Sequence, residues 1–155
     1  MAINSYTPVN NQNNFRGSRK DNLDIAQDLA LRGAQNQSFA FRVHSENMAN
    51  AETTSDKPGG DPYQRKIVDF KVSTDRATGM DMPEINKITK DKTPFRIVLD
   101  PSHPAADANG VVKLSNVESL AEMTGAMVAQ ENHQTLLRGY KMAVSMKNNE
   151  LELMK

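Results

Sequence analysis

The C-terminal part of the chain shows the spacing of apolar residues that is typical of a long helix. Residues 116–155 contain no proline, and large apolar side chains recur there in steps of three and four residues. This period places them along one stripe of an α-helix. The members of the stripe are Val117, Leu120, Met123, Met127, Leu137, Tyr140, Val144, Leu151 and Met154. Ser115-Asn116-Val117-Glu118 has the form of a capping box, so we expect the helix to span 116–155.

Such a helix would be roughly 60 Å long at 1.5 Å per residue, which is longer than a small compact domain needs. Its apolar stripe is weak in the middle, where polar residues occupy or border positions 130–134. Gly125 and Gly139 each cost about 1 kcal/mol of helix stability relative to alanine. We therefore expect this helix to depend on partners.

Residues 21–53 carry a second long helical signal. Ile25 and Leu29 are spaced by four residues, and small side chains gather on another side of the helix around Gly33 and Ala34. Small residues let a second helix approach closely, although an ordinary amphipathic helix would also fit this pattern. Because the chain must turn round between the two helices, we expect them to pair as an antiparallel coiled coil.

The middle segment has a different composition, with six of the seven prolines of the chain. Apolar and polar residues alternate over 68–72 and 95–99, which is typical of strands, and a further short apolar run lies at 111–114. The sequence at 107–110 is a turn signal that could begin a hairpin strand. The chain is therefore predicted to be mainly α with a small β-rich insert.

We divide the chain into four parts on this basis. Residues 1–20 are expected to be a disordered or flexible arm with a net charge of +3, residues 21–53 the first helix, 54–115 the β-rich segment and 116–155 the second helix. Over the whole chain nineteen basic residues balance nineteen acidic ones, which gives no reason to expect nucleic acid as a partner. The chain has no cysteine, no apolar run long enough to span a bilayer and no apolar signal segment at its start.

Residues that could carry catalysis or bind a metal are sparse. The three histidines, His44, His103 and His133, are far apart in the sequence, and no cysteine supplements them. Asp100-Pro101-Ser102-His103 contains the residue types of a catalytic triad, but triads are built across space rather than from adjacent residues. We expect a rigid turn there, and neither an enzyme, a metal site nor a cofactor.

The end of the first helix carries the most specific motif, Asn47-Met48-Ala49-Asn50 followed by Thr53. Two asparagines three residues apart can lie on one helix face and bond to a neighbouring backbone, and Asn50 and Thr53 could help to end the helix. The motif closely resembles the Asn-x-Ala-Asn-x-x-Thr sequence of the first helix in flagellar rod, hook and hook-associated proteins.

Later segments resemble one branch of these axial proteins, the FlgC family of rod proteins. Residues 59–66, with Tyr63, are similar to its Gly-Gly-Pro-Tyr-Arg-Arg/Lys stretch, and 94–107 are similar to its Asp-Pro-Ser-His-Pro-x-Ala-Asp loop. Asn116-Val117 and Glu122-Met123 match its entry into the last helix. An Ala-Ser-Arg-x-Tyr-x-x-Asn run common in that helix is replaced here at 129–136, including Glu131, His133 and Leu136.

The resemblance implies a structural subunit of the proximal rod, in the periplasmic part of the bacterial basal body. Its implied partners are other proximal rod proteins, the adaptor FliE, further copies of itself and the flagellar type III apparatus, which would export it without a cleaved signal. The terminal helices would form an inner tube. A soluble helical-hairpin adaptor or export chaperone remains the alternative. We expect subunit contacts to involve Asn47, Met48, Ala49, Asn50, Thr53, Tyr63, Asn116, Val117, Glu122, Met123, Leu137, Tyr140, Val144 and Leu151.

Overall fold

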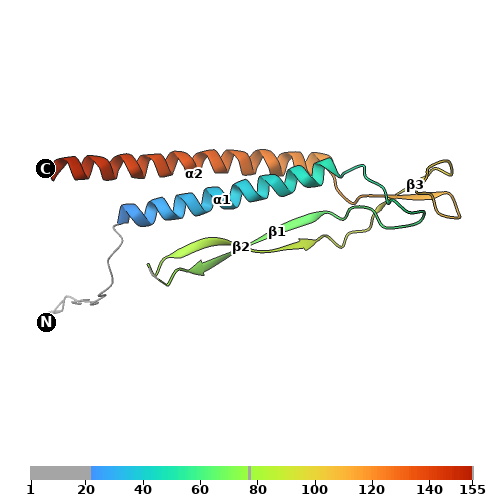
Figure 1. Ribbon diagram of the computed structural model, residues 1–155, viewed down its shortest axis with the longest axis horizontal. Coiled ribbons are helices and arrows are strands. Elements are labelled where there is room, and N and C mark those ends of the chain that lie inside the picture. The colour runs from blue at the N-terminus through green and yellow to red at the C-terminus, as the bar shows by residue number, and fades with distance from the viewer. Residues whose placement is uncertain (1–21, 77, 155) are drawn as a thin grey trace, which may run out of the picture.

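Two long helices lie side by side and run in opposite directions, with a β-hairpin along one of them and a second hairpin beyond their joined ends (Figure 1). The computed structural model describes residues 22–76 and 78–154, so the predicted arm at 1–20 lies outside the described residues. The elements are α1 (Asn22–Ala49), β1 (Lys66–Thr74), β2 (Asp81–Lys90), β3 (Arg96–Leu99), β4 (Val111–Leu114) and α2 (Ser119–Leu153). The mainly α fold with a small β insert is confirmed.

Small residues form the contact between the two helices. Gly33 and Ala34 of α1 and Ala126 and Ala129 of α2 are buried. A Cβ atom on Gly33 would lie 3.1 Å from Leu136 Cδ1, so the helices approach closely at this point. The small-residue side that the sequence shows in the first helix is therefore the side that meets α2.

The large apolar residues of the C-terminal stripe are divided between different environments. Val117 is buried just before α2, and Leu137, Tyr140 and Val144 are half-buried. The remaining members are exposed, namely Leu120, Met123, Met127, Leu151 and Met154. The reason is that alanines and glycines set the spacing between the helices, and this close spacing leaves no room for a full row of large side chains.

The predicted capping box does not form, and α2 begins three residues later than expected. Its N-cap is Glu118, which makes no side-chain capping bond, and its first residue is Ser119. The preceding residues bond to other segments instead. The amide of Ser115 donates to Thr53 O (3.2 Å), and Asn116 Oδ1 accepts from the amide of Arg65 (2.7 Å). These long-range bonds take the place of a first helical turn.

The insert consists of two antiparallel hairpins, β1–β2 and β3–β4. The first lies along α1, where Asn36 Nδ2 donates to Pro83 O (2.9 Å). The sequence did not predict β2, because a register shift opposite Asp69 and Phe70 breaks the alternation of apolar residues. The predicted turn before β4 is confirmed: Gly110 has φ of 76° and its amide donates to Asp107 O (3.0 Å).

Candidate assembly site

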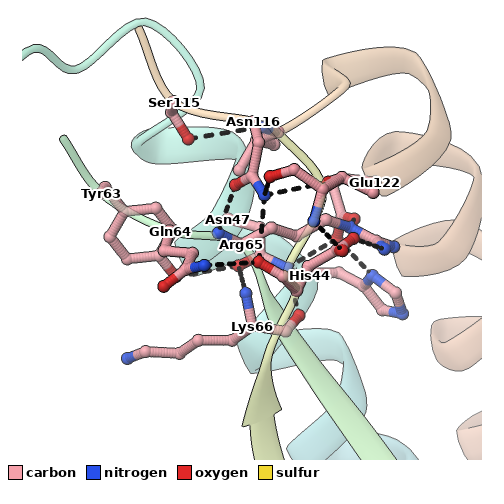
Figure 2. A network of polar contacts seen from close by, with 12 residues as sticks. His44, Asn47, Tyr63, Gln64, Arg65, Lys66, Ser115, Asn116 and Glu122 are labelled. Carbon is pink, nitrogen blue, oxygen red and sulfur yellow. Dashed lines mark hydrogen bonds and ion pairs between the residues drawn. The ribbon is translucent and has the colours of Figure 1, made fainter. Parts of the chain in front are cut away.

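A buried polar cluster lies where α1 ends, α2 begins and β1 starts (Figure 2). Its centre is Glu122, whose side chain is fully buried in the first turn of α2. Three side chains donate to this carboxylate: Arg65 through Nε (2.5 Å), His44 through Nδ1 (2.7 Å) and Asn47 through Nδ2 (2.9 Å). We call His44, Asn47, Tyr63, Arg65 and Glu122 the junction cluster.

Asn47 uses its whole side-chain amide, partly within this cluster and partly on the backbone of Lys66. Its Nδ2 donates to Glu122 Oε2 (2.9 Å) and to the carbonyl oxygen of Lys66 (2.8 Å). Its Oδ1 accepts from the Tyr63 hydroxyl (2.8 Å) and from the amide of Lys66 (2.9 Å). An amide group offers two donors and two acceptor sites, so all of them are occupied. One side chain of α1 thereby fixes both α2 and the start of β1.

The electrostatics of the junction cluster favour its charged form. Burial by itself would raise the pKa of Glu122, but the bonds from Asn47, His44 and Arg65 outweigh it and hold that pKa below the ordinary value. Burial would likewise lower the pKa of Arg65, yet its bonds to Glu122 and Asp91 raise it. Burial and the nearby carboxylates raise the pKa of Tyr63 to about 12, so its hydroxyl stays a donor. The cluster is thus a charged pair with its hydrogen bonds completed.

Further bonds connect the junction cluster to the loop between the two hairpins. Arg65 Nη1 lies 3.1 Å from Asp91 Oδ2, and the pKa of Asp91 is lowered, first by the amide of Thr93 and then by Arg65. Asn116 Nδ2 donates to the carbonyl oxygens of Asp91 (3.2 Å) and Thr93 (3.0 Å). Both ends of the β1–β2 hairpin are therefore held at the junction of the two helices. Such an arrangement can hold the connected segments in a fixed orientation.

The structure brings some of the predicted site residues together and leaves others apart. Asn47, Tyr63 and Glu122 meet in the junction cluster, and Asn116 bonds to its Arg65. The other motif residues end α1: Asn50 Nδ2 donates to Glu46 O (2.8 Å), and Thr53 Oγ1 donates to Asn50 O (2.8 Å). The remaining predicted residues lie outside the cluster, namely Met48, Ala49, Val117, Met123, Leu137, Tyr140, Val144 and Leu151.

Sequence reasoning missed three members of this arrangement. His44 precedes Asn47 by three residues and so lies on the same face of α1, which is a signal that could have found it. Arg65 stands in the same short motif as Tyr63, so its position offered a second clue. No sequence signal pointed to Asp91. It lies beside Arg65 only because β1 and β2 pair antiparallel, which brings the two ends of the hairpin together.

The Asp-Pro-Ser-His segment forms a local turn. Ser102 Oγ donates to Asp100 Oδ1 (2.6 Å), and His103 Nδ1 accepts from the amide of Ala105 (3.0 Å). The serine is therefore bonded to the aspartate rather than to the histidine. Within 22–76 and 78–154, no group of three or more His, Cys, Asp or Glu side chains is placed to hold a metal ion.

Neither α1 nor α2, as far as the structure describes them, is both long and apolar enough to cross a bilayer.

The side of α2 that faces away from α1 carries a second feature, a row of exposed apolar side chains. Ala126 and Ala129 are buried, whereas the neighbouring Met127 and Val128 are 62% and 52% exposed. We call this row the outer face of α2; it consists of Leu120, Met123, Met127, Val128, Met142 and Met146. Its apolar residues form two groups, 120–128 and 142–146, with exposed polar residues such as Glu131 and Arg138 between them, and exposed apolar groups on one helix face typically mark surfaces that meet another protein.

Comparison with known proteins gives one consistent result. No family model matches the chain. The flagellar basal-body rod protein FlgC of Agrobacterium fabrum is 36% identical over 135 residues, which is 87% of this chain and 97% of the relative. The FlgC proteins of Salmonella typhimurium (33% identical, 69% of this chain and 79% of the relative) and Buchnera aphidicola from Acyrthosiphon pisum (32%, 71% and 82%) are also similar. The chain therefore belongs to the FlgC family of flagellar basal-body rod proteins.

Proposed function

We propose that this protein is a structural subunit of the proximal rod of the bacterial flagellum. In this proposal it polymerises with other rod proteins into the shaft that transmits motor torque and encloses the export channel. The observation that supports it is the outer face of α2, together with relatives that are named as basal-body rod proteins. An apolar row on the far side of a two-helix unit is what a subunit with neighbours on that side requires.

The energetics agree with assembly through this face. Burying one Met or Leu side chain is worth about 1.5–3 kcal/mol when the side chain is fully exposed beforehand. Met127, Met142 and Met146 are each between 53% and 63% exposed, so each has about half of that still to gain. Several such residues along one helix would stabilise a contact with a neighbouring subunit. Repeated head-to-tail contacts of this kind generate an open helical array.

The helices and the β-rich segment would occupy different positions in the rod. We propose that α1 and α2 form the inner core domain as an antiparallel coiled coil, and that 54–115 lies outside it. The junction cluster then sets the angle between the two parts, since it bonds to both. The half-buried residues Leu137, Tyr140 and Val144 would complete the core contact as neighbours close around it.

We further propose partners and location on the basis of the family. The partners are the other proximal rod proteins, the adaptor FliE, further copies of this chain and the type III export apparatus. The location is the basal body in the periplasmic space, reached by export without a cleaved signal peptide.

To test assembly through the outer face of α2, the gene in a motile strain is replaced by genes that encode variants. Met127→Lys combined with Met146→Lys places charge on the outer face of α2, and we expect motility to be lost and electron micrographs to show membrane rings without a rod. A matched control is Val72→Lys, which charges an equally apolar, 69% exposed position on β1 and should leave motility intact. Thermal unfolding of the purified variants should be unchanged, since none of these positions is buried.

Normal rods and swimming in the Met127/Met146 variant would contradict assembly through this face. Intact rods after deletion of the whole gene would count against the rod function itself. In that case the adaptor or chaperone alternative would be favoured, and the partner would be sought among exported flagellar proteins.

A further inference from the structure

The outer face of α2 is open along the helix, because α1 covers only the opposite side. Among the described elements α2 contacts α1 alone, and Figure 1 shows α1 between α2 and the β1–β2 hairpin. The exposed Glu131 and Arg138 lie between the two apolar groups of this face. The order in which apolar and charged residues follow one another along the face indicates what it can pair with.

This order is nearly symmetric about a midpoint between residues 134 and 135. Met127 and Met142 lie equally far from the midpoint, one on each side of it. Glu131 and Arg138 also lie equally far from it, and their charges are opposite. At 3.6 residues per turn, these four side chains point within about 60° of one another. When two identical helices pair antiparallel about such a midpoint, each residue before it meets the equally distant residue after it on the other copy.

We propose that a second copy of this chain covers the outer face of α2, in an antiparallel dimer with a two-fold axis through this midpoint. Met127 of each copy meets Met142 of the other, and Met123 likewise meets Met146. These four side chains are between 40% and 63% exposed in the single chain, so each has apolar surface left to bury. Methionine suits such a contact because its flexible side chain adapts to the opposite surface.

Charge favours the antiparallel direction over the parallel one. In the antiparallel dimer, Glu131 of each copy meets Arg138 of the other, which gives two ion pairs across the contact. In a parallel pair, each charge would meet its own copy and repel it. The Arg138 guanidinium donates to Thr135 Oγ1 (2.9 Å), and within 22–76 and 78–154 neither Glu131 nor Arg138 forms an ion pair. Both charges can therefore pair with a second copy.

The size of the contact predicts a weak, reversible dimer. From Leu120 to Met146 the face is about 40 Å long, and a helix with its side chains is about 10 Å wide. The dimer would then bury about 400 Å² on each copy, or about 800 Å² in total, which is less than stable interfaces bury. A two-fold contact closes on itself and adds no further copies. Under the proposed rod function, on which this consequence alone rests, the dimer must dissociate before the same face can join a rod.

Sedimentation equilibrium of the full chain, from about 5 to 500 µM, tests for this weak dimer. We expect monomer and dimer and no larger species. Glu131→Arg makes both charge pairs repulsive and should raise the dissociation constant roughly tenfold or more. Adding Arg138→Glu in the same chain re-forms both pairs with their signs exchanged and should restore the dimer. The matched control is Glu150→Arg, which makes the same charge change on another side of α2 and should leave the dimer unchanged.

Cysteine crosslinking tests the direction of the pair, since the chain has no cysteine of its own. Gln134→Cys places the thiols of two copies beside the two-fold axis, so oxidation should give a covalent dimer. Met127→Cys places them about 22 Å apart in the antiparallel dimer, so it should crosslink only when mixed with Met142→Cys.

Three outcomes would overturn the proposal. They are a chain that stays monomeric at every concentration, species larger than a dimer that grow with concentration, and a Met127→Cys chain that crosslinks to itself as readily as Gln134→Cys. The first would leave the outer face without a second copy, the second would mean an open head-to-tail contact, and the third a parallel pair. Motility enters neither experiment, so none of these outcomes bears on the proposed rod function.

Discussion

Replacing Arg65 by alanine should destabilise the fold far more than its partly exposed position suggests. Arg65 is the cation that bonds to the fully buried carboxylate of Glu122. Removing one partner of a buried ion pair costs about 3–5 kcal/mol, because the other charge is left without compensation. Arg65 keeps 30% of its side chain exposed, and Asn47 and His44 continue to donate to Glu122. We therefore expect a loss of about 2–3 kcal/mol in the free energy of unfolding.

The assay is thermal and urea unfolding of the purified chain at pH 7, followed by helical circular dichroism. A loss of this size corresponds to a fall in Tm of about 5–10 °C for a chain of this length. The matched control is Lys113→Ala, which breaks the ion pair to Asp61, where the two side chains are 39% and 69% exposed. Exposed pairs contribute less than about 1 kcal/mol, so this variant should unfold close to the parent.

A double variant shows whether the unpaired charge is the cause. Arg65→Ala with Glu122→Gln removes the uncompensated carboxylate, while the glutamine oxygen can still accept from Asn47. More than half of the lost stability should return. If Arg65→Ala costs no more than Lys113→Ala, or if the second substitution restores nothing, the reasoning about the buried pair is refuted.

Three further predictions concern the helix pair. The fold lowers the pKa of Glu122, so the ionised carboxylate stabilises the fold above the ordinary carboxyl pKa of about 4.3. This stabilisation is lost as the pH falls through the lowered pKa. Glu122→Gln should therefore weaken the dependence of the free energy of unfolding on acid pH. Gly125→Ala should lower Tm despite the better helix propensity of alanine, since the new Cβ would lie 2.5 Å from His44 Cε1. Gly139→Ala, with no atom within 4 Å of the new Cβ, should raise the free energy of unfolding by about 0.5–1 kcal/mol. An unchanged Tm in Gly125→Ala would contradict the close contact with His44, and a lower Tm in Gly139→Ala would contradict the open space beside Gly139.

Local sequence signals predicted the elements that depend on neighbouring residues. The period of apolar residues indicated two long helices, and the turn before β4 was indicated by a glycine at the position that needs positive φ. Asn50 and Thr53, marked as residues that could end the first helix, bond to the backbone at the end of α1. These features could be predicted because each depends on interactions between residues that are close together in the sequence.

Contacts between distant segments decided the rest. The capping box at Ser115 was locally favourable, but the amide of Ser115 bonds to Thr53 instead. Strand β2 was missed because the register shift against β1 disturbs its alternation. The face of α2 that meets α1 was set by Gly33 and the alanines, so larger residues such as Met127 were left outside.

The sequence by itself determined that this protein has two terminal helices around a β-rich insert, and its motifs indicated its family. The tertiary structure decided that Glu122 is buried and that His44, Asn47 and Arg65 converge on it. These residues come from three separate segments, and a charge can be buried only where donors from all of them arrive together. Periodicity reports which residues share a face of one element, whereas the partner of that face depends on how the elements pack.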